Sequence, residues 1–434
     1  MTDLDLMLRL TLQLVVILVT CRVIGWLGRR FFGQTQVVME MIAGIALGPS
    51  LFGILWPQGQ AWLFPREWLV GGQALHHPSM SVLYCFSQLG LLLYMFLVGL
   101  EFDSKILRQS SGTALSVSIA GIVAPFVLGG ALGLALSGNG LFFGANVTTW
   151  NAAIYMGAAM CITAFPTLAR ILYEQGLAGT PLGTLALAAG ASNDVVAWAL
   201  LAVVIGLTKS DPKYAIFAIG GGVLYALVIL FLGRRWLKPL GTATEKAGRL
   251  TSTTFLITLV CVLFCAWFTD MIGIYAVFGA FLVGVAMPKG EFARLVEQQL
   301  QVPVSSLLLP IFFVYSGLNT KIGLLDSSYL WGVTAVVCAV AIVGKGLSCA
   351  LASRGTHRPW RESWAIGSLM NARGMMELIL VNIALAAKVI TPTLFTILVI
   401  MAVVTTLMAS PLSKWLLGSR SVEDRALDAG PSPV

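Results

Sequence analysis

The sequence predicts an all-α polytopic membrane protein with about thirteen transmembrane helices. Hydrophobic residues make up 58% of its 434 residues and charged residues only 11%, a balance typical of chains that lie in lipid. Apolar stretches long enough to cross a bilayer recur along almost the whole chain, and the loops between them are too short for a soluble domain. Proline, glycine and charged residues interrupt two of these stretches, which predicts two discontinuous helices.

Charged residues, glycine and proline divide the chain into thirteen apolar spans. These spans lie near 5–27, 36–56, 82–100, 114–136, 150–173, 182–207, 213–232, 251–268, 271–288, 302–317, 329–352, 362–387 and 392–416. Few residues join spans eight and nine, and span ten is short, so a count of twelve stays open. The first span follows two aspartates and no small-residue cleavage site comes after it, which favours a retained helix over a signal peptide.

The basic residues predict the orientation of the chain in the membrane. Under the thirteen-span interpretation, 18 Lys and Arg residues fall on one side and 5 on the other. Because cytoplasmic loops carry the excess of Lys and Arg, we expect a cell-membrane protein with its N-terminus outside and its polar tail, 418–434, in the cytoplasm. This topology explains the net charge of +8, since the basic residues form no patch with interleaved aromatic residues, and we expect no nucleic-acid partner.

Asp194 is the most unusual residue of the sixth span, the apolar run 182–207. No Lys or Arg lies in this run. A charge at bilayer depth costs roughly 2.5 kcal/mol or more, so an acid in a membrane span is a functional hypothesis by default. The alternative is a protonated acid that is buried for packing or that faces another subunit.

The fifth span contains the first predicted helix break. Pro166 has no N–H, so the carbonyl group of Ile162 loses its helical partner and the helix should kink or unwind there. Thr163 adds a hydroxyl group at the same depth. A simple structural kink is the alternative interpretation, because proline is common in membrane helices.

The twelfth span contains the second predicted break, at Gly374. Asn371, Arg373 and Glu377 surround this glycine in an otherwise apolar helix. Arg373 and Glu377 are four residues apart, so they can share one helix face and partly neutralise each other. Here too, a kink without a functional role is the alternative.

The two breaks occupy corresponding positions in the two halves of the chain. The break in span five is followed by Asp194 in span six, and the break in span twelve is preceded by Lys345 in span eleven. Discontinuous helices at matching positions point to inverted repeats with a binding site near the middle of the membrane. Spans four to six and eleven to thirteen are the expected matching units, from this pattern alone.

Several ordered motifs carry a resemblance to a known family. They are 42–51 (IAGIALGPSL), 96–103 (FLVGLEFD), 162–170 (ITAFPTLAR), 193–198 (NDVVAW), 276–282 (AVFGAFL), 310–313 (PIFF) with 316–318 (SGL), and 371–378 (NARGMMEL). With these motifs in this order, the chain resembles the monovalent cation:proton antiporters. The resemblance is to the second large branch, which contains bacterial sodium/proton and potassium/proton antiporters and the plant cation/proton exchangers.

This resemblance implies an architecture. It implies a single transporter domain over 1–417 with inverted repeats and two crossed discontinuous helices, which is the sodium/proton antiporter fold. It further implies a mobile core made of the helices near 82–207 and 302–416, a dimerisation scaffold made of the helices near 5–56 and 251–288, and a homodimer. Many relatives carry a regulatory nucleotide-binding domain after the membrane part, and we expect none here because only the tail 418–434 follows.

The chemistry of the predicted site depends on Asp194. A desolvated carboxylate can hold either a proton or a small monovalent cation, so Na⁺, K⁺ or Li⁺ would compete with H⁺ for it. A hard cation also needs neutral oxygen ligands. The candidates are the backbone carbonyl region of Ile162 and the side chains of Thr163, Ser192 and Asn193.

Asn193 and Lys345 bear on the stoichiometry of exchange. Many electrogenic relatives have two adjacent acids where this chain has Asn193 followed by Asp194, so the resemblance favours electroneutral exchange of one proton for one cation. Lys345 complicates this, because electrogenic relatives place a lysine on the equivalent helix, where its own titration would make exchange electrogenic. The structural alternative is that Lys345, Arg373 and Glu377 compensate charge at the ends of the broken helices.

Three other classes of protein compete with an antiporter. A cation channel-like efflux protein would conduct without obligatory proton movement. An organic-anion/sodium symporter of related fold would need a roomier polar cavity and no lone titrating acid. An enzyme is disfavoured, because the seven cysteines lack metal-ligand spacing, the three histidines lie in loops, and we find no catalytic constellation and expect no cofactor.

Overall fold

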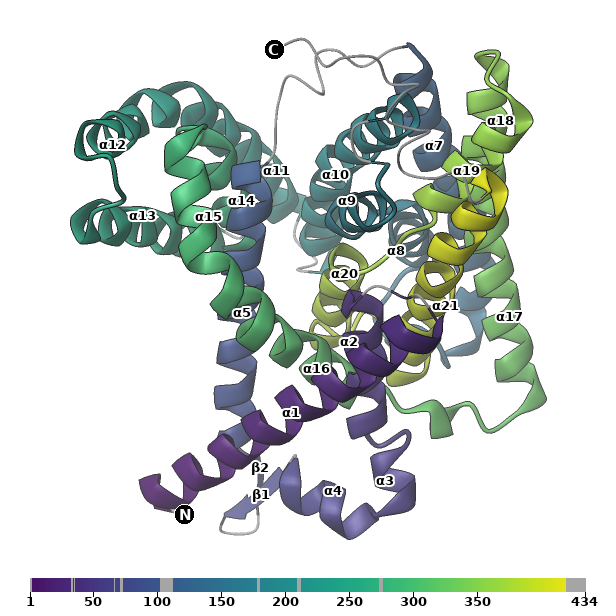
Figure 1. Cartoon of the computed structure of the whole chain (residues 1–434). Helices are drawn as coiled ribbons and strands as arrows, with labels where there is room; N and C mark the ends of the chain where they lie inside the picture. Colours follow the sequence, from purple (N-terminus) through teal and green to yellow (C-terminus); the bar gives the residue numbers. More distant parts are fainter. Residues whose placement is uncertain are drawn as a thin grey trace. The chain divides into compact units, whose positions relative to one another are not determined.

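The computed structural model is helical over nearly all of the residues that it describes. These are 2–32, 34, 36–65, 67–70, 73–101, 112–177, 180–208, 212–272 and 276–418. The chain divides into two compact units, each made of three segments. Figure 1 shows the helices along the chain, and the two units are described one at a time below.

Unit 1 contains Met1–Val23, Ala43–Asp103 and Ile205–Leu318. Its helices, with α1 and α2 shared with unit 2, are α1 (Asp3–Phe32), α2 (Gln36–Leu47), α3 (Phe52–Leu55), α4 (Pro57–Leu63), α5 (Pro78–Glu101), α11 (Pro212–Leu227), α12 (Arg234–Ala247), α13 (Ser252–Met271), α14 (Ala276–Ala286), α15 (Glu291–Pro303) and α16 (Leu309–Leu318). Its strands are β1 (Glu67–Val70) and β2 (Gln73–His76). Helix α5 packs against α14, α15 and α16, and Figure 1 shows α5, α14 and α15 side by side.

Unit 2 contains Ile24–Ile42, Ser104–Val204 and Asn319–Val434. Its helices are α7 (Gly112–Leu136), α8 (Thr149–Cys161), α9 (Phe165–Glu174), α10 (Pro181–Thr208, whose end lies in unit 1), α17 (Ser328–Ile342), α18 (Ser348–Gly355), α19 (Trp360–Met370), α20 (Met375–Ala386) and α21 (Pro392–Leu417). Helix α7 packs against α8 and α18, and α19 packs against α18 and α21. Each break predicted from the sequence falls between two short helices of this unit.

The apolar helices make this a multi-pass membrane protein. Within the described part of the chain, nine helical stretches are long and apolar enough to cross a membrane. The predicted all-α class is confirmed, whereas the exact count of thirteen spans stays a prediction. The predicted core includes α5 and α16, which by contact belong to unit 1 together with α13 and α14, so the division into core and scaffold also stays a prediction.

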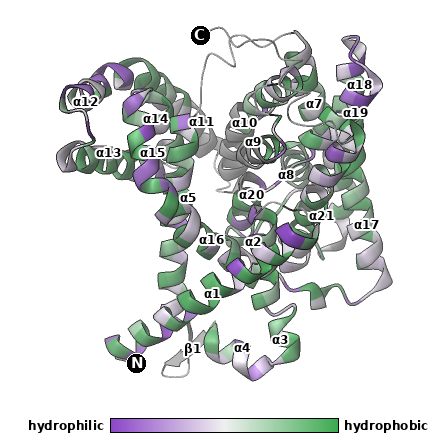
Figure 2. Ribbon diagram, in the orientation of Figure 1, coloured by the Kyte–Doolittle hydropathy of each residue, from purple (hydrophilic) through white to green (hydrophobic). Residues whose placement is uncertain are grey.

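Two polar helices extend spans seven and ten beyond the ranges predicted from hydropathy. Span seven continues through a π-helical turn, Val228–Gly233, into α12, and span ten begins with α15, eleven residues before its predicted start. Both added helices carry many hydrophilic residues, as Figure 2 shows, so a search for apolar runs stops at their edge. Their amphipathic patterns are typical of helices at a membrane boundary.

The loop between α4 and α5 contains strands that the sequence analysis did not predict. β1 and β2 pair antiparallel, with Glu67 opposite His76 and Val70 opposite Gln73. The segment 67–70 reads Glu-Trp-Leu-Val, and aromatic and β-branched residues favour extended structure. Such a short run between two membrane spans gives no signal by hydropathy.

Glycine allows α5 and α14 to approach each other closely. A Cβ atom on Gly99 would overlap the carbonyl oxygen of Phe281, and one on Gly284 would overlap that of Phe96. Small residues let membrane helices pack backbone to backbone in this way. The ammonium group of Lys289 then donates to the carbonyl oxygens of Leu100 at 2.7 Å, Gly99 at 3.1 Å and Gly284 at 3.3 Å, so one side chain caps both helices.

We expect Gly284→Ala to destabilise the protein by about 1–3 kcal/mol, because the added methyl group forces α5 and α14 apart. The melting temperature of the detergent-solubilised protein measures this. Gly332→Ala on α17 is the matched control, since a Cβ atom added there would meet no atom of another helix within 4 Å. Equal melting temperatures for the two variants would show that the close approach is not needed.

Candidate functional site

The candidate site begins with two interrupted helices in unit 2. Helix α8 ends at Cys161 and α9 begins at Phe165, so residues 162–164 are unwound. Ile162 has extended backbone angles, φ −66° and ψ 132°. Pro166 follows as the second residue of α9, in the first turn, where a proline costs no helical hydrogen bond. The second interruption separates α19, which ends at Met370, from α20.

The two unwound segments are bonded to each other. The amide N–H of Ala164 donates to the carbonyl oxygen of Ala372 at 3.1 Å. Gly374 makes the crossing possible, because a Cβ atom there would lie 2.6 Å from the hydroxyl oxygen of Thr167 on α9. Four helix ends therefore meet at one place: the carboxyl ends of α8 and α19 and the amino ends of α9 and α20.

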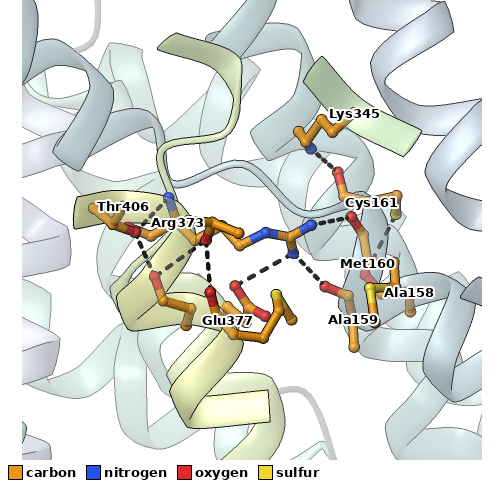
Figure 3. A network of polar contacts seen from close by, with 11 residues as sticks. Ala158, Ala159, Met160, Cys161, Lys345, Arg373, Glu377 and Thr406 are labelled. Atoms are coloured by element: carbon orange, nitrogen blue, oxygen red, sulfur yellow. Dashed lines mark hydrogen bonds and ion pairs between the residues drawn. The ribbon is translucent and has the colours of Figure 1, made fainter. Parts of the chain in front are cut away.

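Two cations satisfy the carboxyl end of α8. The guanidinium group of Arg373 donates to the carbonyl oxygens of Ala159 at 2.9 Å and Met160 at 2.7 Å. The ammonium group of Lys345 donates to the carbonyl oxygen of Cys161. Figure 3 shows both side chains pointing at this helix end. The interruption leaves these carbonyl groups without the next helical turn, and positive charge is favourable at a carboxyl helix end.

Glu377 balances part of this positive charge. It lies in the first turn of α20 and forms an ion pair with Arg373, with 3.3 Å between the nitrogen and the carboxylate oxygen. Both side chains are buried, at 0% and 1% exposure. Thr406 on α21 fixes the backbone of Arg373, because its hydroxyl group accepts from the amide N–H at 3.1 Å and donates to the carbonyl oxygen at 3.0 Å.

Lys345 reaches the site from a π-helical turn. The turn, Val343–Leu347, interrupts the α-helical run of α17 and α18, and such turns recur at functional sites. Gly346 follows the lysine and brings α19 close, because a Cβ atom there would lie 2.5 Å from the amide nitrogen of Asn371. Lys345 itself is fully buried. Lys345 therefore satisfies a carbonyl group at the end of α8 from a helix that lies 184 residues later in the chain.

Asn193 joins α10 to the first unwound segment. Its side-chain NH₂ donates to the hydroxyl oxygen of Thr163 at 3.1 Å, and its amide oxygen accepts from the hydroxyl of Ser118 on α7 at 2.6 Å. All three side chains are buried. Ser192 instead donates to the carbonyl oxygen of Ala188 in its own helix at 2.9 Å. Asp194 follows on α10, and its side chain lies outside the described part of the chain.

The structure thus brings most of the predicted site residues to one crossing. Thr163 is adjacent to Ala164, and Arg373 is adjacent to Ala372, so the polar side chains flank the backbone bond between the segments. Sequence reasoning missed Ser118. A single serine among the small residues of α7 carries no signal, since nothing in the sequence separates it from Ser116, which is only partly buried.

We expect Arg373→Ala to destabilise the protein by about 3–5 kcal/mol, because it leaves Glu377 buried without its partner and uncaps two carbonyl groups. The control is Arg358→Ala, since Arg358 and Glu362 form an ion pair of the same spacing and distance, 3.3 Å, at about one-third exposure. That pair should contribute no more than about 1 kcal/mol. Thermal unfolding in detergent compares the variants, and equal losses would contradict a supporting role for Arg373.

Comparison with known proteins agrees with the geometry. A family model described as sodium/hydrogen exchanger, transmembrane, matches residues 15–418. The Na(+)/H(+) antiporter NhaS4 of Synechocystis is 40% identical over 415 residues, covering 94% of this chain and 97% of that protein. Cation/H(+) antiporter 18 of Arabidopsis thaliana is 38% identical over 406 residues, covering 92% of this chain and 48% of the plant protein.

A solved structure shares the fold. The sodium proton antiporter MjNhaP1 of Methanocaldococcus jannaschii superimposes with a TM-score of 0.60 at 15% identity, covering 98% of this chain and 100% of that one. The resemblance stated from the sequence motifs is therefore confirmed. Since the family model covers nearly all of its residues, the chain belongs to the transmembrane sodium/hydrogen exchanger family.

Proposed function

We propose that this protein exchanges a monovalent cation, Na⁺, K⁺ or Li⁺, for H⁺ across the cell membrane by alternating access, with cation and proton competing at Asp194. The observation that carries the proposal is the bonded crossing of the two interrupted helices, Ala164 to Ala372. Family membership supports the exchange, and the relatives named above are Na⁺/H⁺ and cation/H⁺ antiporters.

The position of Asp194 in the chain supports its role. It directly follows Asn193, whose amide is bonded to Thr163 in the unwound segment. The same segment contributes the backbone bond to the second break. An acid at this position of α10 is thus next to a residue whose side chain is bonded to the Thr163 hydroxyl of the unwound segment, and unwound backbone offers neutral oxygen ligands for a cation.

The exchange reaction needs one group that changes its charge. The Asp194 carboxylate binds a cation on one side of the membrane and releases it on the other. It then takes a proton there, and the neutral carboxyl group returns to give the proton up. Thr163, Ser192 and the carbonyl region of Ile162 are the proposed neutral ligands. Asn193, predicted from the sequence as another ligand, has its amide oxygen bonded to Ser118 and contributes by holding Thr163.

The cations at the crossing have another task in this proposal. Lys345 and Arg373 donate to the carbonyl groups that end α8, and Glu377 pairs with Arg373. We assign these three residues to charge compensation. Asp194 is then the only acid that exchanges its proton for a cation, which favours electroneutral exchange of one H⁺ for one cation.

Orientation and assembly are part of the same proposal. The basic residues favour an N-terminus outside and a cytoplasmic C-terminus. The resemblance to antiporters of this branch favours a homodimer, with one body of helices moving against another that holds the dimer together.

We expect Asp194→Asn to abolish cation-driven proton flux, because an amide cannot exchange a proton for a cation. The assay uses proteoliposomes with a pH-sensitive dye, to which sodium, potassium, lithium and rubidium salts are added in turn. Asp326→Asn, an exposed acid in a loop, is the control and should retain wild-type flux. Flux that persists in Asp194→Asn would contradict the proposal, and cation conductance without proton movement would indicate a channel.

We expect the wild-type exchange rate to be indifferent to membrane voltage. The same proteoliposomes are clamped at several potentials with valinomycin and potassium gradients, using sodium or lithium as the exchanged ion. A rate that rises with voltage would mean that net charge moves in each cycle. In that case Lys345→Gln tests whether the lysine titrates, since a purely structural lysine would leave the voltage dependence in place.

A further inference from the structure

A chain of three hydrogen-bonded side chains links α7 to the first helix break. The hydroxyl of Ser118 donates to the amide oxygen of Asn193 at 2.6 Å, and the NH₂ of Asn193 donates to the hydroxyl oxygen of Thr163 at 3.1 Å. Ser118 is 3% exposed, Asn193 2% and Thr163 0%. In a membrane interior no water is available to replace a lost hydrogen bond, so each of these polar groups depends on its partner in the chain.

The direction of these bonds fixes how Asn193 is oriented. Its amide oxygen, the one atom of the side chain that can bind a cation, faces Ser118 on α7. Its NH₂ group faces Thr163. Asn193 in this conformation therefore acts on the cation site through Thr163. The hydroxyl oxygen of Thr163 accepts from the Asn193 amide on α10, and this bond fixes the orientation of the hydroxyl group.

The packing of α7 supports this orientation. Gly121 lies one turn after Ser118, and a Cβ atom there would lie 3.5 Å from the amide nitrogen of Asn193 and 2.7 Å from Sγ of Cys349. Sγ of Cys349 lies 3.6 Å from the carbonyl oxygen of Val117. Two successive turns of α7 thus enclose the Asn193 amide, and Ser118 supplies the polar contact.

We propose that Ser118 is a positioning residue of the cation site. It holds the Asn193 amide, and the amide holds the Thr163 hydroxyl beside the unwound segment. The inference rests on the proposed function, because it assigns Thr163 to the cation.

Removing the Ser118 hydroxyl leaves the amide oxygen of Asn193 buried without this donor. The amide then turns to find another partner, and Thr163 loses its fixed orientation. An unsatisfied buried acceptor is unfavourable, so the amide leaves the orientation that holds Thr163, and we expect the KM for the cation to rise about tenfold. The maximal rate and its pH profile should not change, because neither Ser118 nor Asn193 exchanges a proton.

The test compares Ser118→Ala with Ser116→Ala in the proteoliposome assay. Ser116 is partly exposed on the same helix and donates to the carbonyl oxygen of Gly112 in that helix, so it is a matched control whose KM should stay at the wild-type value. Proton flux is measured over a range of sodium or potassium concentrations. A Ser118→Ala variant with wild-type KM would overturn the inference.

A double-mutant cycle separates positioning from a general structural effect. If Ser118 acts through Asn193, Ser118→Ala should raise KM in the wild-type background and change nothing further in Asn193→Ala. An equal increase in both backgrounds would overturn the inference, because Ser118 would then act by another route. Failure of the proposed function is a different result, the absence of cation-driven proton flux in the wild-type protein.

Discussion

The structure of unit 2 depends on how the carbonyl groups at the end of α8 are satisfied. When a helix ends inside the membrane, no water is available for its last carbonyl groups, so each of them needs a hydrogen-bond donor from elsewhere in the protein. Here the donors are the guanidinium of Arg373 and the ammonium of Lys345, each fully buried. Both are cations, and each comes from a segment more than 180 residues away in the chain.

This constraint explains several local features at once. The π-helical turn and the glycine at 346 bring Lys345 within reach, and the glycine at 374 lets the second break lie against Thr167. The ion pair to Glu377 keeps Arg373 from being a lone buried charge, which would be strongly unfavourable. Charge, backbone geometry and helix packing at the crossing are therefore solutions to one problem.

Much of the fold and part of the site followed from the sequence because their signals are local. Pro166, Gly374 and the charged residues stand out within apolar runs, and each marks its own position. Local signals of this kind do not indicate which polar groups, far apart in the sequence, form hydrogen bonds with each other. The bonds of Arg373 to Ala159 and of Asn193 to Ser118 join separate helices, and the helices α12 and α15 are too polar to be found as apolar runs.

The bond between Ala164 and Ala372 runs from main chain to main chain. No side chain takes part in it, so substitutions that preserve the backbone path leave this tie intact, and only a residue lacking an N–H at 164 would delete it. The two half-helix pairs are therefore joined by an element that needs the backbone path, which Gly374 permits, but no particular side chain at 164 or 372. A substitution near the crossing that keeps the backbone path can therefore change the side chains around the site and still retain the linkage between the two breaks.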